Sequence, residues 1–184
     1  MMEFKGYRRD DGKVGTRNYV GIISTVVCAN EVAEKISSQV FGTVPFLHQQ
    51  GCCQTPLDIN RVTNVLIGLG RNPNLASVLL VSLGCESVEL EAVVKGISQT
   101  GKSVETVTIQ EIGGSARAVA EGMLLAEEMA RDASRLERTV CAAGDLVLGL
   151  KCGSSDTTSG LFSNPALGCR APLGVAQILL LLTK

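Results

Sequence analysis

Cysteine and histidine are the residues of this chain whose types and positions point to chemistry. The chain has seven cysteines and one histidine among 184 residues. Thiolate and imidazole groups bind soft or borderline metals such as iron and zinc, and both also act as nucleophiles or bases. A single free cysteine is better explained as a small buried residue. The positions of the cysteines relative to the predicted strands therefore decide what they indicate.

Four of the predicted strands are each followed by a cysteine. Apolar runs predict strands over 19–27, 43–47, 77–83 and 146–150. Ligands of a parallel sheet bind outside the carboxyl ends of its strands. We therefore expect the cysteines at these positions to converge on one metal site, which the following residues would form: Cys28, Cys52, Cys85 and Cys152. The alternative is that they are small residues that fit tight strand-to-helix turns.

The remaining polar residues near these strand ends suggest acid–base chemistry. His48 is a candidate base or metal ligand, or a hydrogen-bonded turn histidine. Glu86 is either catalytic or a residue that favours the positive end of the following helix. We take Asp156 as a third catalytic candidate, and Cys52 as the member of the vicinal pair Cys52–Cys53 that faces the site. The sequence contains no CxxC pair, no GxGxxG and no Walker motif.

Helices alternate with the strands that must position these residues. Helical spacing of apolar residues predicts helices over 31–41, 56–68, 88–98 and 115–135, with a further strand over 104–109. Five such strand–helix alternations predict an α/β fold: a Rossmann-like, doubly wound, mainly parallel sheet with helices on both faces. We expect the polar, glycine-rich head through Asn18 to be an irregular lead-in.

Composition narrows the class of protein. Hydrophobic residues make up 45% of the chain and aromatic residues only 3%, an aliphatic bias that suits a sheet buried on both faces. The net charge is −1 and no basic stripe is present, which argues against a nucleic-acid partner. No signal peptide and no membrane-spanning run is evident, so we expect a cytoplasmic protein with reduced cysteines.

A series of short motifs resembles a known enzyme family. The motifs are Gly-Thr-Arg-Asn at 15–18, Ser-Thr-Val-Val-Cys at 24–28, His48 with Gly-Cys at 51–52, Leu-Gly-Cys-Glu at 83–86, Cys-Gly-Ser-Ser-Asp at 152–156, Ser-Gly at 159–160 and Asn-Pro-Ala-Leu-Gly at 164–168. In this order they resemble the altronate and galactarate dehydratases, and also the large subunit of sulfolactate sulfo-lyase. The resemblance covers most of the chain but does not select a member of the family.

The resemblance implies a lyase that acts on a sugar acid or a related hydroxy acid. Such an enzyme removes a proton α to a carboxylate and then expels water, or sulfite in the sulfo-lyase. It implies a divalent metal, usually iron as Fe2+, with an iron–sulfur centre as an alternative. The metal would stabilise the charge that develops on the carboxylate. We assign four residues in or next to these motifs to substrate binding: Arg17, Asn18, Gln54 and Asn164. The guanidinium of Arg17 suits a carboxylate clamp, and a surface salt bridge is its alternative.

Two departures from the family pattern shape our expectations for domains and partners. Family members continue beyond the Asn-Pro-Ala-Leu-Gly segment into a further functional region, and the stretch after Gly168 does not resemble that continuation. We therefore expect one α/β dehydratase-family domain over 1–168 and an atypical apolar tail over 169–184, which is the product of a truncation or a frameshift, or belongs to a subunit that pairs with another.

The expected partners are a sugar-acid substrate and the rest of the catalytic region or a small substrate-binding domain or subunit. We expect the apolar run at 178–182 either to cover an exposed face or to mediate self-association.

Two other functions compete with the hydro-lyase. The chain could be a non-catalytic assembly or regulatory domain that keeps the fold, which metal content would distinguish. A Rossmann-like nucleotide-binding domain is the other, and the missing glycine fingerprint counts against it.

Overall fold

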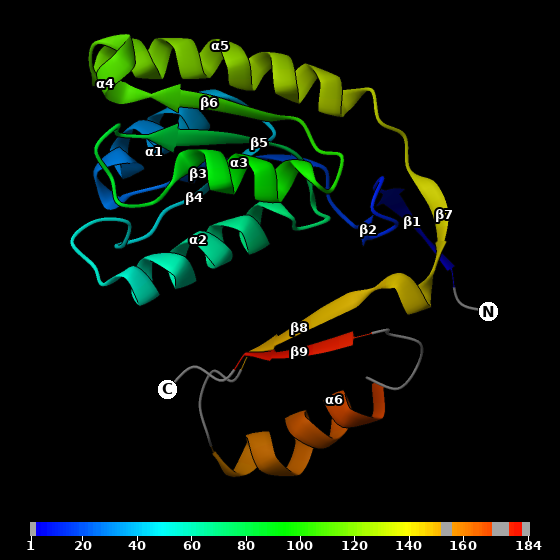
Figure 1. Cartoon of the computed structure of the whole chain (residues 1–184). Helices are drawn as coiled ribbons and strands as arrows, with labels where there is room; N and C mark the ends of the chain where they lie inside the picture. The colour runs from blue at the N-terminus through cyan, green and yellow to red at the C-terminus, as the bar shows by residue number, and fades with distance from the viewer. Residues whose placement is uncertain (1–2, 152–155, 171–176, 182–184) are drawn as a thin grey trace. The chain divides into compact units, whose positions relative to one another are not determined.

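The computed structural model describes residues 3–151, 156–170 and 177–181 (Figure 1). Its contacts divide the chain into two compact units. Unit 2, Tyr7–Glu137, holds most of the secondary structure, and unit 1 consists of Met1–Gly6 and Arg138–Lys184. We describe each unit by itself.

Unit 2 is built on a parallel sheet of four strands. They are β3 (Tyr19–Ser24), β4 (Thr43–Phe46), β5 (Leu75–Ser82) and β6 (Val104–Thr108), in the order β4-β3-β5-β6. All three pairings are parallel. The first strand of the sheet, β3, thus lies between the second and the third. Such a reversal of strand order marks the place where ligands bind in open α/β sheets.

Helices connect the parallel strands. They are α1 (Asn30–Gln39), α2 (Pro56–Gly70), α3 (Leu90–Ser98), α4 (Ile109–Ile112) and α5 (Ser115–Ser134), with a short 3-10 turn η1 at Val27–Ala29. Pro56 begins α2, as predicted, because its missing N–H costs nothing in the first turn. No helix of the described ranges is both long and apolar enough to cross a bilayer.

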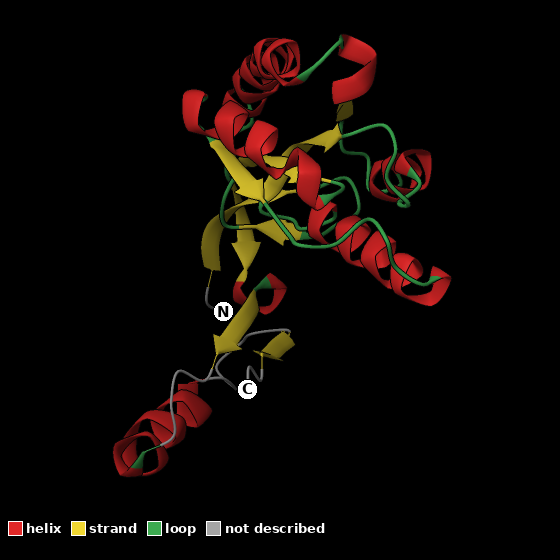
Figure 2. Cartoon of the chain, turned by 90° about the vertical axis from the view of Figure 1, so that its left-hand side faces the viewer, coloured by secondary structure: helices red, strands yellow, loops and turns green. Residues whose placement is uncertain are grey.

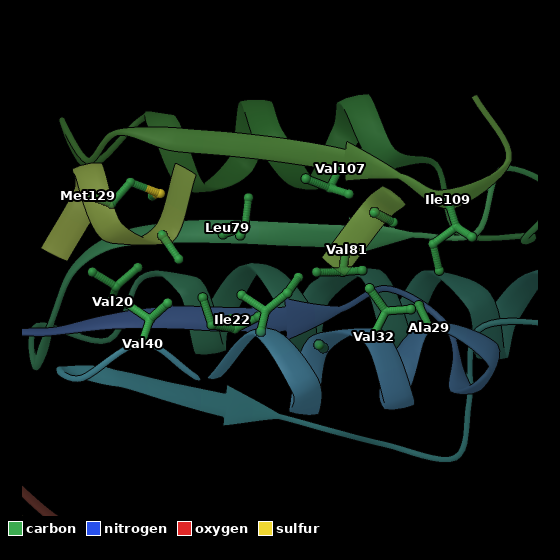
Figure 3. Close-up of a cluster of buried hydrophobic side chains, with 14 of the residues drawn as sticks. Val20, Ile22, Ala29, Val32, Val40, Leu79, Val81, Val107, Ile109 and Met129 are labelled. Carbon is green, nitrogen blue, oxygen red and sulfur yellow. The ribbon is translucent and has the colours of Figure 1, made fainter. Parts of the chain in front are cut away.

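The helices cover both faces of the sheet, as Figure 2 shows. Side chains of β3 and β5 alternate between two apolar clusters, so that Ile22 packs toward α1 and α5 while Ile23 packs toward α2 and α3. Figure 3 shows the first cluster, in which Leu79 and Val107 point toward the same helices as Ile22. The predicted α/β arrangement of a parallel sheet with helices on both faces is therefore present, and the Rossmann-like assignment stays a prediction.

Short elements make up the remainder of the described chain. Strand β1 (Glu3–Arg8) pairs antiparallel with β7 (Thr139–Ala142) in unit 1 through Glu3–Gly6, and with β2 (Val14–Gly15) in unit 2 through Tyr7 and Arg8. A 3-10 turn η2 (Ala143–Asp145) follows β7. Strand β8 (Val147–Lys151) pairs in parallel with β9 (Gln177–Leu181). Between them lie the π-helical turn η3 (Ser159–Ser163) and α6 (Asn164–Arg170).

Two sequence predictions are wrong. The head of the chain is not irregular, because β1 and β2 form there, and β1 finds its partner β7 more than a hundred residues away. The predicted strand over 146–150 exists as β8, but it pairs with β9 and is no fifth strand of the parallel sheet. In both cases the partner of the strand is set by long-range pairing, which apolar periodicity does not encode.

The loop after β4 is held against the end of β3 by its backbone. Gln50 accepts a hydrogen bond from the N–H of Val27 at 3.0 Å, and the Gly51 carbonyl accepts one from Ser87 at 3.0 Å. Gly51 is buried at φ +107, and a Cβ there would lie 2.5 Å from the Thr25 carbonyl oxygen and 2.8 Å from the Val26 Cα. Only glycine therefore allows this close approach of the loop to the sheet.

A buried lysine lies at the opposite edge of the sheet. The Lys102 side chain is 7% exposed, and its Nζ donates to the carbonyl oxygens of Gly70 at 2.9 Å and Asn72 at 2.5 Å. It thereby binds carbonyls at the carboxyl end of α2, where cations are favoured. Burial lowers the pKa of Lys102 from 10.5 to about 8, and of the nearby charges Arg9 and Lys13 lower it further while Asp11 opposes them.

We predict that the free energy of unfolding rises between pH 8 and pH 10.5 because of Lys102. The pKa is about 8 in the folded chain and near 10.5 in the unfolded one, so the unfolded chain binds more protons in this window. The stabilisation is fully present above the unfolded-state pKa and is lost as the pH falls through the folded-state pKa. The size of the pKa shift limits the change in the free energy of unfolding to about 3 kcal/mol. Urea unfolding across this range, compared with Lys102→Met, measures it, and parallel profiles for the two proteins would contradict it.

We also predict opposite effects for alanine at two glycines. Gly51→Ala should destabilise the chain by more than about 2 kcal/mol, since the new Cβ meets backbone atoms at a left-handed φ. Gly68→Ala is the matched control, because it lies in α2 with nothing within 4 Å of the added Cβ. It should stabilise the chain by roughly 0.5–1 kcal/mol. Chemical denaturation measures both, and equal effects would show that the loop is free to move.

Candidate functional site at the carboxyl edge of the sheet

Three cysteine-bearing loops lie at the carboxyl edge of the parallel sheet. Cys28 follows β3, Cys52 lies in the loop after β4, and Cys85 follows β5. The side chains of all three are exposed. Because the strands are parallel, their carboxyl ends share one edge, and the bond from Ser87 to Gly51 ties the second loop to the third. The structure therefore brings three of the four predicted cysteine positions to one edge.

A hydrogen bond joins the loops after the two central strands. Thr25 Oγ1 donates to Glu86 Oε1 at 2.6 Å, and the Gly84 N–H donates to Glu86 Oε2 at 2.7 Å. The half-buried carboxylate thus lies beside the ends of β3 and β5, where the strand order reverses. Each carboxylate oxygen keeps further lone pairs, so Glu86 retains the capacity to accept another hydrogen bond or a proton.

The ring of His48 is held in one tautomer. Its Nδ1 accepts a hydrogen bond from the backbone N–H of Gln50 at 3.1 Å, so Nε2 must carry the proton that it shares with the Ser24 carbonyl oxygen at 2.8 Å. Asn30 fixes the residue further by donating to the His48 carbonyl at 2.8 Å. Both ring nitrogens are therefore engaged. The base or ligand role of His48 stays a prediction, and it requires that one of these bonds open first.

Cys52 and Cys53 form a contacting pair of thiols. Their Sγ atoms are 3.6 Å apart, and both side chains are exposed. Hydrogen bonding with Cys52 is the largest of the effects that raise the pKa of the Cys53 thiol, followed by the charge on Cys52, burial and the charge on Cys28. Cys28 is thus near enough to Cys53 to influence it. Since the two sulfurs of the pair lie together, position does not single out Cys52.

Cys85 has a polar partner from the next strand. Gln110, which follows β6, points its Nε2 toward the Cys85 Sγ at 3.5 Å. Gly84 has φ +113, and a Cβ at that position would lie 2.9 Å from the Gln110 Oε1. Glycine thus allows the turn that carries Cys85 and Glu86 to pack closely against Gln110.

Three predicted substrate-binding residues have other roles in the described geometry. Arg17 and Asn18 precede β3 and lie at the amino edge of the sheet, where Asn18 Nδ2 donates to the Ala133 carbonyl at 2.7 Å. Strand β3 therefore separates them from Cys28. Gln54 holds the loop after β4 together, because its Oε1 accepts from the Gly51 N–H at 3.0 Å. Substrate binding by these residues stays a prediction.

The other predicted site residues belong to unit 1 or to undescribed positions. Asp156 Oδ1 accepts from the Ser159 N–H at 2.6 Å and from Thr158 Oγ1 at 2.7 Å, and these hydrogen bonds lower the pKa of the carboxyl. The carboxylate thus stabilises the start of the turn that leads into η3. Asn164 begins α6 and is exposed. Cys152 lies outside the described residues.

The described residues do not form a metal site by themselves. Within ranges 3–151, 156–170 and 177–181, no three side chains of His, Cys, Asp and Glu lie together as ligands of one ion. A divalent ion at the carboxyl edge would need further donors besides the described side chains. The predicted metal ligands therefore stay a prediction.

Sequence analysis missed two residues that organise this edge. The hydroxyl of Thr25 donates to Glu86. The side-chain amide of Asn30 donates to the backbone carbonyl of His48, and its Oδ1 accepts from the backbone N–H of His48 and from Ser24 Oγ, the latter at 2.5 Å. Ser24 and Thr25 are both fully buried, although they are polar. These two polar residues, next to each other in an apolar run, could have indicated that hydrogen-bond partners lie close by, because buried polar groups require partners.

Comparison with known proteins assigns the chain to a family. The second-domain model of D-galactarate dehydratase/altronate hydrolase matches residues 6–134, which is more than half of the chain. The C-terminal model of D-galactarate/altronate dehydratase matches residues 143–177, which extends beyond Gly168 into the predicted tail.

Individual relatives agree with this match. The chain is 39% identical over 165 residues to the (2R)-sulfolactate sulfo-lyase subunit beta of Chromohalobacter salexigens, covering 90% of this chain and 42% of the relative. It is 34% identical over 185 residues to altronate dehydratase of Bacillus subtilis, covering 95% and 37%. It is 29% identical over 194 residues to galactarate dehydratase (L-threo-forming) of Escherichia coli, covering 92% and 36%. The chain thus spans about two fifths of the length of these relatives, and it belongs to the D-galactarate dehydratase/altronate hydrolase family.

Proposed function

We propose that this chain is part of a metal-dependent hydro-lyase that dehydrates a sugar acid of the altronate or galactarate type. The observation that carries the proposal is the bond between Thr25 and Glu86, which fixes a carboxylate beside the ends of β3 and β5. The family membership supports the reaction class, since two of the relatives are named dehydratases. The substrate would be a small hydroxy acid that enters at this edge.

Glu86 is the side chain that we assign to proton transfer. Dehydration breaks the C–H bond α to the substrate carboxylate, and the electron pair then expels the β-hydroxyl as water. A base is needed for the first step and an acid for the second. Glu86 is held by two donors, which fixes its position, and it retains lone pairs for a proton. Neutral His48 is the second candidate, once the Gln50 N–H releases its Nδ1.

Thiols at the same edge are the donors that we assign to a divalent metal, since thiolates bind soft or borderline ions such as iron and zinc. Of the two, iron is the ion that the family resemblance implies. Cys28 and Cys85 follow the two central strands and are exposed, so their sulfurs are accessible to an ion. A bound metal would stabilise negative charge on the substrate carboxylate. Cys52, in the loop after β4, is the further donor that we assign to this ion. Because the described residues supply no complete set of ligands, the remainder would come from another segment or subunit.

Elimination of sulfite is the second candidate function. The sulfo-lyase subunit beta from Chromohalobacter is 39% identical to this chain, which is the observation that favours it. Both eliminations begin with loss of a proton α to a carboxylate and differ in the leaving group. An assay that offers altronate, galactarate and sulfolactate to the complete protein distinguishes them, because water loss yields a keto acid without sulfite.

We predict that Glu86→Gln lowers kcat by roughly 10²–10⁴-fold, the usual contribution of a positioned acid or base. Glu89→Gln is the matched control, since Glu89 is exposed and its side chain makes no capping hydrogen bond at the start of α3. That control should keep activity within about twofold of the wild type, because surface substitutions are usually mild. Steady-state kinetics of the complete protein measures both changes. Equal activities of the two variants would remove Glu86 from the reaction.

We also predict that sulfur-to-oxygen changes lower metal content. Cys28→Ser and Cys85→Ser should each reduce the iron bound per chain, because a hydroxyl is a poorer ligand for a soft metal. Cys141→Ser is the control, since Cys141 is buried in β7. Elemental analysis after anaerobic purification of the complete protein gives the ratio. Unchanged iron in Cys28→Ser and Cys85→Ser would remove these two thiols from the metal site.

A further inference from the structure

The vicinal thiols of Cys52 and Cys53 lie on the same side of the chain. Side chains of consecutive residues in extended backbone point in opposite directions. Here the two Sγ atoms are only 3.6 Å apart, and both are exposed to solvent. The backbone therefore departs from the extended form in a way that brings two thiols together.

Cys53 has the unusual backbone conformation that produces this contact. Its φ is +56, and among non-glycine residues of the described ranges it alone has a positive φ. The left-handed conformation is unfavourable for a residue with a Cβ, because the Cβ approaches the following carbonyl oxygen. The surrounding loop imposes it, because Gly51 is fixed by Ser87 on its carbonyl and by Gln54 on its N–H. Strain of this kind occurs where the arrangement of side chains has a use.

We propose that Cys52 and Cys53 are a reversible oxidation site that closes to a vicinal disulfide. The loop already holds the sulfurs in contact. Closure requires both side chains to rotate and the backbone of these two residues to adjust, because the disulfide closes a ring that includes the peptide bond between them. Solvent exposure leaves both sulfurs accessible to a small oxidant. Packing alone does not account for the pair, since neither side chain is buried.

The oxidant that we assign is a peroxide. One thiol attacks the O–O bond and becomes a sulfenic acid, with release of one water. The sulfur of the second thiol then attacks the sulfenic sulfur, and the hydroxyl departs with the remaining thiol proton as a second water. Two S–H bonds and one O–O bond are broken, while one S–S bond and two O–H bonds form. The peroxide is reduced and the two sulfurs are oxidised. A dithiol reductant reverses the change by thiol–disulfide exchange.

Oxidation would also remove a ligand from the proposed metal site, a consequence that rests on the proposed function. A sulfur in a disulfide is no longer a thiolate ligand, so Cys52 would be lost as a donor. The oxidation itself requires neither metal nor substrate. Failure of the hydro-lyase proposal would thus leave the oxidation measurable.

Peptide mapping of the full chain after treatment with hydrogen peroxide tests the proposal. Trypsin cleavage places Cys28 in peptide 18–35, the vicinal pair in peptide 36–61 and Cys85 in peptide 72–95. We expect peptide 36–61 to lose the mass of two hydrogens and to resist alkylation, while the peptides with Cys28 and Cys85 are alkylated normally. Dithiothreitol should restore both alkylation sites.

Two further measurements separate the vicinal disulfide from other products. Phenylarsine oxide should bind to peptide 36–61 in equal molar amount, because two neighbouring thiols displace its oxygen as water. Cys53→Asn keeps a residue that tolerates the left-handed conformation and should abolish both reactions. A disulfide between peptides 18–35 and 36–61, or oxidation of either thiol without closure, would overturn the proposal, as would failure to bind the arsenical.

Discussion

Burial of β3 and β5 on both faces controls where this chain can place polar groups. Ile22, Ile23, Leu79 and Leu80 have no exposed surface, since helices pack on each side of the central strands. An unpaired polar side chain within this pair of strands would lose its hydration without replacement. The polar residues within the two strands are small serines, Ser24, Ser77 and Ser82, and the charged and thiol groups of the candidate site follow the strand ends. The Thr25–Glu86 bond, the His48 network and the cysteine-bearing loops all satisfy this constraint.

Elements dominated by local pattern were predictable from the sequence. The apolar run around Leu79 predicted β5, because a strand buried on both faces is apolar throughout. Apolar residues at helical spacing, with two glycines before Ser115, predicted α5, because a helix buried along one stripe repeats its apolar residues with the period of the helix. Strand β1 was missed since its partner β7 lies more than a hundred residues further along the chain, beyond unit 2. The same limit led to the wrong sheet for β8.

The location of the candidate site in the fold was predictable from the sequence, whereas the arrangement of its side chains was not. Counting residues past each strand placed Cys28 and Cys85 at one edge, since parallel strands share a direction. It could not predict that both nitrogens of His48 are engaged, because those bonds come from Ser24 and Gln50 through the fold of a loop. It likewise could not predict that the sulfurs of Cys52 and Cys53 touch, which depends on one left-handed residue.

The backbone bonds that link Gly51 to Ser87 and Gln50 to Val27 also determine how this edge moves. Each bond joins a loop to its neighbour, so no loop can leave the sheet without breaking the bonds of the next. The three loops then open as one cooperative unit, with a single free energy for the whole edge. Amide protons of Val27 and Ser87 would exchange with solvent in step, although sixty residues separate them along the chain.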